Sequence, residues 1–302
     1  MKIFSIFLIL IIIITLNTVT AQAGKPTLSV EGTARPGSVL FLTIKGLSLD
    51  AKVTGKWEKF NLNFFKNGEN WRTIIPISRH ISIGNHNLTI NITDQNNNNS
   101  FSRAIKISRH HFGSQYLSLP KSQSDKYDDP ALDKEYDLMY KTLSTVSYDF
   151  SPNVPFKLPV DAPVTTPYGL TRFINNEQAG WHKALDLGAG SGEPIIAPQK
   201  GKVILARNGL IIHGNTIVID HGYGLLSLYL HLNKINVKEG AIVSLGTKIG
   251  TVGSSGVASG PHLHWGTYIY GVPVDPQVLI SIPKTWQDQA ISSTKQTAPP
   301  VP

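Results

Sequence analysis

Short runs in which apolar and polar residues alternate recur along almost the whole chain, and no other feature constrains its fold as strongly. Over residues 27–108 these runs are separated by turn residues, as at 39–44, 73–77 and 87–92. Alternation puts the apolar side chains on one face of an extended strand and the polar ones on the other. Several half-buried strands at this spacing predict a small antiparallel β-sandwich.

The pattern returns over residues 156–279, now with glycine-rich turns, and predicts a second domain made of strands. Between the two regions, Asp129 and Pro130 offer an N-cap and a proline at the first helical position. Apolar residues then follow at helical spacing, at Leu132, Tyr136, Met139 and Leu143. One amphipathic helix is therefore expected to join the two domains.

We predict an all-β protein with an amino-terminal Ig-like β-sandwich, a connecting helix and a carboxy-terminal antiparallel β-sheet domain. The expected divisions are a signal peptide at 1–23, the sandwich at 24–110, a linker at 111–155 with a helix at about 130–146, the second β domain at 156–280 and a disordered tail at 281–302.

The amino-terminus is typical of exported proteins. Lys2 precedes a nearly pure apolar run at 3–16, and Ala21-Gln22-Ala23 forms a small-x-small cleavage site. An uncleaved anchor is the alternative, because roughly 20 apolar residues span a bilayer. We expect cleavage, no stable membrane span afterwards, and a mature protein in the periplasm, the cell envelope or the medium.

The chain contains no cysteine, so any metal must be held by histidine and carboxylate groups. Its formal net charge of +8 suits an anionic polymer such as cell wall, although a merely soluble basic surface explains the charge equally well. We expect no nucleic-acid partner, and favour a monomer.

Five polar residues stand inside apolar or glycine-rich strand contexts of the second domain: His182, Asp186, His231, His262 and His264. Because side chains alternate along an extended chain, His182 and Asp186 are expected to share a face, and so are His262 and His264. Each pair can then enter one cleft.

Two histidines and an aspartate suit a catalytic zinc ion, because three protein ligands leave one tetrahedral position open for water. The pKa of water bound there falls from about 15.7 to about 7. The same donors also fit Fe(II), so an iron-dependent oxygenase is an alternative, although the sequence carries no signal for a cosubstrate pocket.

These segments resemble the lysostaphin-type peptidoglycan endopeptidases, also called LytM-like metallopeptidases. The signature segments read WHKALD at 181–186 and SGPHLHW at 259–265, and between them DHGYG at 220–224 and YLHL at 229–232 agree in order and spacing. The likeness covers most of residues 156–279. More weakly, the amino-terminal sandwich resembles the domain before the catalytic module in some exported members.

The resemblance implies that His182, Asp186 and His264 bind zinc and that His231 and His262 form the catalytic pair. One of the pair would take a proton from water and the other would stabilise charge on the carbonyl oxygen, in an order that the sequence leaves open. The implied reaction is hydrolysis of peptide bonds in peptidoglycan.

Four neighbouring residues carry further expectations. Tyr229 and Trp265 are predicted to contact substrate as walls of the cleft, with core packing as the alternative. Arg172 falls at a family position near the site and is interpreted as structural. Ala184 stands where the family usually has glycine, and its methyl group is expected to face the metal and narrow the substrate range.

A catalytically silent member of the family, serving as a wall-binding or hydrolase-activating module, is an alternative from another functional class. Loss of a ligand or of a catalytic histidine would mark that state, and none is missing here. The sequence leaves open which peptide bond is cut, whether the wall is the cell's own, what the amino-terminal domain does and whether a segment blocks the cleft.

Overall fold

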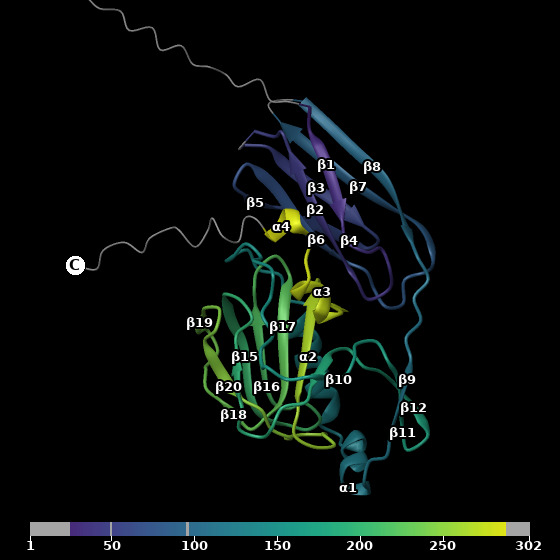
Figure 1. Cartoon of the computed structure of the whole chain (residues 1–302), viewed down its shortest axis with the longest axis vertical. Coiled ribbons are helices and arrows are strands. Elements are labelled where there is room, and N and C mark those ends of the chain that lie inside the picture. The colour runs from purple at the N-terminus through teal and green to yellow at the C-terminus, as the bar shows by residue number, and fades with distance from the viewer. Residues whose placement is uncertain (1–24, 49, 95–96, 288–302) are drawn as a thin grey trace, which may run out of the picture.

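A computed structural model describes residues 25–48, 50–94 and 97–287, and most of its regular structure is β-strand (Figure 1). The predicted all-β class is confirmed, with several antiparallel sheets and few helices. The expected signal peptide lies outside these residues. Among the helices that the structure describes, none combines the length and the apolar character needed to cross a bilayer.

Two four-stranded antiparallel sheets form the amino-terminal part, which is the upper half of Figure 1. In spatial order the first contains β1 (Thr27–Glu31), β2 (Val39–Lys45), β6 (Asn70–Pro76) and β5 (Phe65–Asn67). The second contains β4 (Phe60–Asn63), β3 (Lys52–Trp57), β7 (Gly84–Asp94) and β8 (Asn97–Ile107). Leu42, Trp57 and Ile90 share one apolar cluster, so the two sheets pack as a sandwich.

An eight-stranded antiparallel sheet dominates the carboxy-terminal part. Its spatial order is β10 (Val164–Thr166), β13 (Leu185–Leu187), β21 (Leu263–Ile269), β17 (Leu225–Leu232), β16 (Gly214–Asp220), β15 (Gly201–Leu210) and β19 (Ile242–Val243), with β22 (Val272–Val274) beside β21. A smaller sheet contains β14 (Pro194–Ile196), β20 (Lys248–Thr251) and β18 (Lys234–Ile235). Alternate residues of β17 and β21 enter different apolar clusters, so the central strands are covered on both faces.

The segment between the two parts contains more structure than the linker that we expected. Strand β9 (Ser114–Leu117) pairs in parallel with β11 (Thr171–Ile174), which pairs antiparallel with β12 (Glu177–Trp181). Three helices follow β9: α1 (Lys121–Ser124), the 3-10 helix η1 (Asp125–Asp128) and α2 (Leu132–Leu143). Met139 of α2 packs with Leu205 and Leu228, which fixes the helix against the large sheet.

A shared apolar core joins the two parts, because Phe41 and Phe65 of the sandwich cluster with Phe156 and Trp286. Helices α3 (Pro276–Ile280) and α4 (Lys284–Gln287) end the described chain. The prediction of a disordered tail is therefore wrong for residues 281–287, and the rest of that segment lies outside the described residues. Trp286 is only 2% exposed and meets Phe41 edge-on with 5.1 Å between ring centroids. Burial of this large aromatic side chain therefore helps to anchor the segment.

Candidate metal centre

Three of the predicted side chains meet where β12, β13 and β21 come together. Asp186 in β13 and His264 in β21 are directly paired across the sheet, and His182 follows the end of β12. An oxygen of Asp186, Oδ1, lies 2.9 Å from His182 Nε2 and 2.8 Å from His264 Nδ1. The two ring nitrogens are 3.2 Å apart. The structure therefore brings together the donor atoms of His182, Asp186 and His264.

His182 reaches this point by a route that alternation did not predict. No strand continues between β12 and β13, so His182 and Asp186 do not share the face of one strand. Instead the backbone of His182 bonds to the preceding loop, through its N–H to Leu170 O at 2.8 Å and its O from Gly169 N at 2.8 Å. Ala184 is fully buried and does not line the cavity, and a narrower substrate range through its methyl group stays a prediction.

The protonation states of His182, Asp186 and His264 favour binding of a cation. His182 Nδ1 donates to Pro167 O at 2.8 Å, so in the neutral ring Nε2 carries a lone pair that points at a carboxylate oxygen. Burial would raise the pKa of Asp186, but the hydrogen bonds and charges of His182 and His264 hold it well below its usual range. Burial lowers the pKa of His264 to about 4, so this ring is neutral near pH 7. Three electron-pair donors this close together, from two imidazoles and a carboxylate, fit a divalent metal ion.

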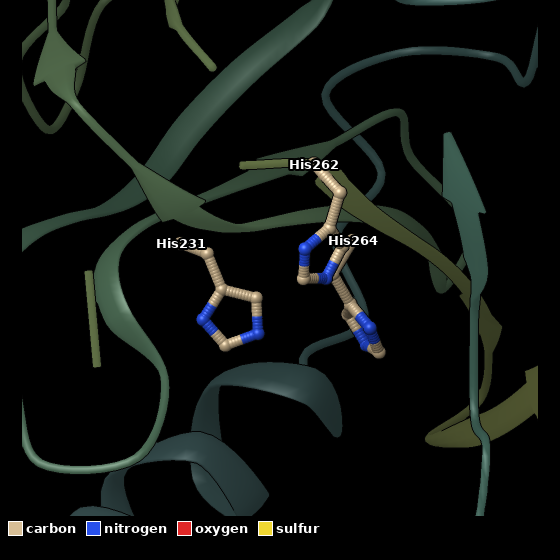
Figure 2. A group of neighbouring side chains, drawn as sticks. All are labelled: His231, His262 and His264. Atoms are coloured by element: carbon tan, nitrogen blue, oxygen red, sulfur yellow. The ribbon is translucent and has the colours of Figure 1, made fainter. Parts of the chain in front are cut away.

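His231 and His262 lie beside this group, and Figure 2 shows their rings close to that of His264. The ring centroid of His231 is 5.2 Å from that of His262 and 5.8 Å from that of His264. His231 Nδ1 donates to Ser255 O at 2.8 Å, and His262 Nδ1 donates to Gly260 O at 2.9 Å. In the neutral form of either ring, Nε2 is therefore unprotonated and can accept a proton.

The lowered pKa of His231 supports a neutral ring with a free Nε2. Burial lowers its pKa to about 3, and the nearby His264 and His262 rings act in the same direction. His231 is consequently neutral at pH 7 and carries no proton on Nε2.

A cavity of about 280 Å³ opens over these side chains. Arg172, which we interpreted as structural, also lines it, and its Nε donates to Gln115 Oε1 at 3.0 Å. Gln115, Leu117 and Tyr127 of the connecting segment line the cavity as well, and sequence reasoning missed all three. The parallel pairing of β9 with β11, for which the sequence carries no local signal, places Gln115 and Leu117.

The prediction that Tyr229 and Trp265 contact substrate is wrong. Both are 0% exposed and pack in the core beneath the large sheet. Trp265 directly follows His264 in β21, and consecutive residues of a strand point to opposite faces. Since His264 faces the cavity, Trp265 must face the core.

Comparisons with known proteins identify the domain that holds these groups. Residues 180–276 match the profile described as Peptidase family M23. The peptidoglycan DD-endopeptidase ShyA of Vibrio cholerae is 37% identical over 120 residues, which cover 38% of this chain and 28% of that protein. The murein hydrolase activator NlpD of Escherichia coli is 38% identical over 97 residues, which cover 32% of this chain and 25% of that protein.

A solved structure assigned to peptidase M23 from Pseudomonas aeruginosa shares the fold over 82% of this chain and 94% of its own, with a TM-score of 0.61 and 24% identity. The fold likeness thus extends beyond the region matched by the family profile. All five polar side chains described above lie inside that region, and residues 180–276 form a domain of peptidase family M23.

Proposed function

We propose that this protein is a zinc-dependent metalloendopeptidase that hydrolyses peptide bonds in peptidoglycan. The proposal rests above all on the approach of Asp186 Oδ1, His182 Nε2 and His264 Nδ1 to within 3.2 Å of one another. Two imidazoles with free Nε2 atoms stand beside them, in a cavity large enough to admit part of a peptide chain. Further support comes from ShyA, a relative that is a peptidoglycan DD-endopeptidase.

In this proposal His182, Asp186 and His264 hold the zinc ion, and the chain offers no cysteine that would change the donor set. A bound zinc ion would supply Lewis acidity, which lowers the pKa of water and polarises a carbonyl group. The Pro167 carbonyl fixes the tautomer of His182, so that its Nε2 is the ligating atom. The strand pairing of β13 with β21 sets the distance between the other two ligands.

His231 and His262 are the proposed proton-transfer and charge-stabilising groups. Each has its Nδ1–H committed to a backbone carbonyl, which orients the ring and leaves Nε2 toward the cavity side chains. As a neutral imidazole, His231 would take a proton from the attacking water and later return it to the leaving amine. His262, when it carries a proton on Nε2 as well, would donate a hydrogen bond to the carbonyl oxygen of the scissile bond and so stabilise negative charge there.

The likeness to NlpD favours a second candidate, a domain that activates other wall hydrolases without cutting. An activator needs neither metal ligands nor proton-transfer groups. The complete set of five side chains in this chain therefore argues for catalysis.

Digestion of purified sacculi of known cross-link chemistry tests the proposal. Zinc-loaded protein should release fragments whose masses place a new amine and a new carboxylate within stem or cross-link peptides. Asp186→Asn should release none, whereas Asp161→Asn, which removes an exposed carboxylate of the carboxy-terminal part, should match the wild type. Intact sacculi after incubation with zinc-bound wild type would refute the proposal, and stimulation of a separate wall hydrolase under those conditions would favour the activator.

A further inference from the structure

A buried carboxylate outside the metal centre makes an unusual number of hydrogen bonds. Glu135 of helix α2 is 5% exposed and faces the turn between β15 and β16. Its Oε1 accepts from Ile212 N at 3.1 Å, from His213 N at 3.1 Å and from His213 Nδ1 at 2.5 Å. Its Oε2 accepts from Ile211 N. Three consecutive backbone N–H groups and one imidazole thus converge on a single side chain.

The turn at residues 211–213, which Glu135 holds, is hydrogen-bonded both to His231 and to the loop that contacts its ring. His213 O accepts the backbone N–H of His231 at 3.1 Å. Ile212 O accepts the N–H of Val257 at 2.9 Å, which fixes the loop that follows β20. Ser255 of that loop accepts the Nδ1–H of His231 through its carbonyl oxygen. The N–H, the ring and the carbonyl oxygen of His231, which accepts from Ser255 N at 3.3 Å, are therefore all bonded to residues tied to this turn.

The backbone of His231 needs this support. Its φ is +63°, in the left-handed region that non-glycine residues rarely adopt. Such a conformation costs free energy and persists only where the surrounding structure enforces it. The contacts that hold His231 are the bond from its N–H to His213 O, the bond from its ring to Ser255 O and the bond from Ser255 N to its carbonyl oxygen.

We propose that Glu135 is a positioning residue for His231, and that helix α2 holds the imidazole in place through this buried carboxylate. Orientation of a proposed proton-transfer group would then depend on the segment that joins the two parts of the chain. The catalytic consequence rests on the proposed function, whereas the structural consequence for His231 does not.

Histidine NMR on the full-length protein tests the positioning role directly. In zinc-loaded protein labelled with ¹⁵N-histidine, His231 should show one tautomer with the proton on Nδ1, and a His231→Asn spectrum assigns its signal. Glu135→Gln keeps the size of the side chain but removes its charge and replaces one acceptor with a donor. It should shift the signal of His213, its direct partner, and broaden or shift that of His231, while the other histidine signals and the zinc content stay unchanged. Asp137→Asn, an exposed carboxylate on the same helix, should leave every histidine signal in place.

Turnover of a soluble cross-linked muropeptide supplies the second readout. With Glu135→Gln we expect kcat about 10²-fold lower, because small misplacements of a reacting group have effects of this size, and KM within about twofold of wild type. An unchanged His231 signal, or an equal change in all histidines, overturns the proposal. If Glu135→Gln does not fold, Glu135→Asp, whose shorter carboxylate cannot reach all three N–H groups, undergoes the same tests. An inactive wild type would count against the proposed function only, since the NMR result still decides the role of Glu135.

Discussion

Replacement of His231 by asparagine separates the chemical role of the ring from its structural role. The amide nitrogen of asparagine can occupy the position of Nδ1 and donate to Ser255 O, as the ring does over 2.8 Å. Asparagine also tolerates the left-handed backbone that His231 adopts at φ +63°. Only the free Nε2 is lost. By contrast, His231→Ala would leave the Ser255 carbonyl without this donor, at a cost of about 1–3 kcal/mol.

The expected loss follows from what remains in place. Removal of a general base lowers turnover by about 10²- to 10⁴-fold, or about 3–5 kcal/mol of transition-state stabilisation. None of the three proposed metal ligands is altered, so zinc content should remain that of the wild type. Since the substituted atom belongs to the proton-transfer step, KM should change far less than kcat.

Steady-state hydrolysis of a soluble muropeptide, together with metal analysis of the same samples, measures both quantities. His262→Asn serves as the matched variant, because it also loses Nε2 and can keep its hydrogen bond to a backbone carbonyl. If His231→Asn retains kcat within about threefold of the wild type, the general-base reasoning fails. Loss of zinc from this variant would show instead that His231 is a ligand.

Three further predictions concern residues outside the proposed group of metal ligands and proton-transfer histidines. Trp286→Ala should lower the free energy of unfolding in urea by about 3–5 kcal/mol, because the ring is buried between the two parts of the chain, and a loss below about 1 kcal/mol would contradict the anchoring role. Tyr229→Phe should leave KM unchanged, since the ring does not reach the cavity, and a raised KM would restore its predicted contact with substrate. Hydrogen bonds lower the pKa of Glu135 from 4.5 to about 2 against the effect of burial, so its stabilising contribution is present above pH 4.5 and is lost as pH falls to about 2. The difference in melting temperature between wild type and Glu135→Gln should therefore shrink over that acid range, and a constant difference would argue against this ionisation.

Local sequence patterns predicted the strands whose formation depends on one buried face. Alternation located β2, β6 and β7 to within three residues of their observed ends, because one buried face imposes a period of two. It carried no information on partners distant along the chain. The parallel pairing of β9 with β11 and the docking of Trp286 on the sandwich both depend on contacts between remote segments.

In the candidate site, too, alternation placed some residues correctly, whereas contacts with remote segments could not be predicted. Alternation over residues 262–264 predicted that His262 and His264 face one side, and both line the cavity. Applied consistently, it would also have placed Trp265 in the core, and the error came from treating an aromatic neighbour of a ligand as a cleft wall. The approach of His182 to Asp186 could not be derived in this way, because it depends on backbone bonds to the loop at Gly169.

The most direct test of the central claim is an anomalous difference map, recorded at the zinc absorption edge from crystals grown with zinc. We predict one strong peak per chain, at about 2.0–2.2 Å from His182 Nε2, Asp186 Oδ1 and His264 Nδ1, with a fourth position left to solvent. A peak coordinated by other side chains, or no peak at these three atoms in zinc-saturated crystals, would contradict the account.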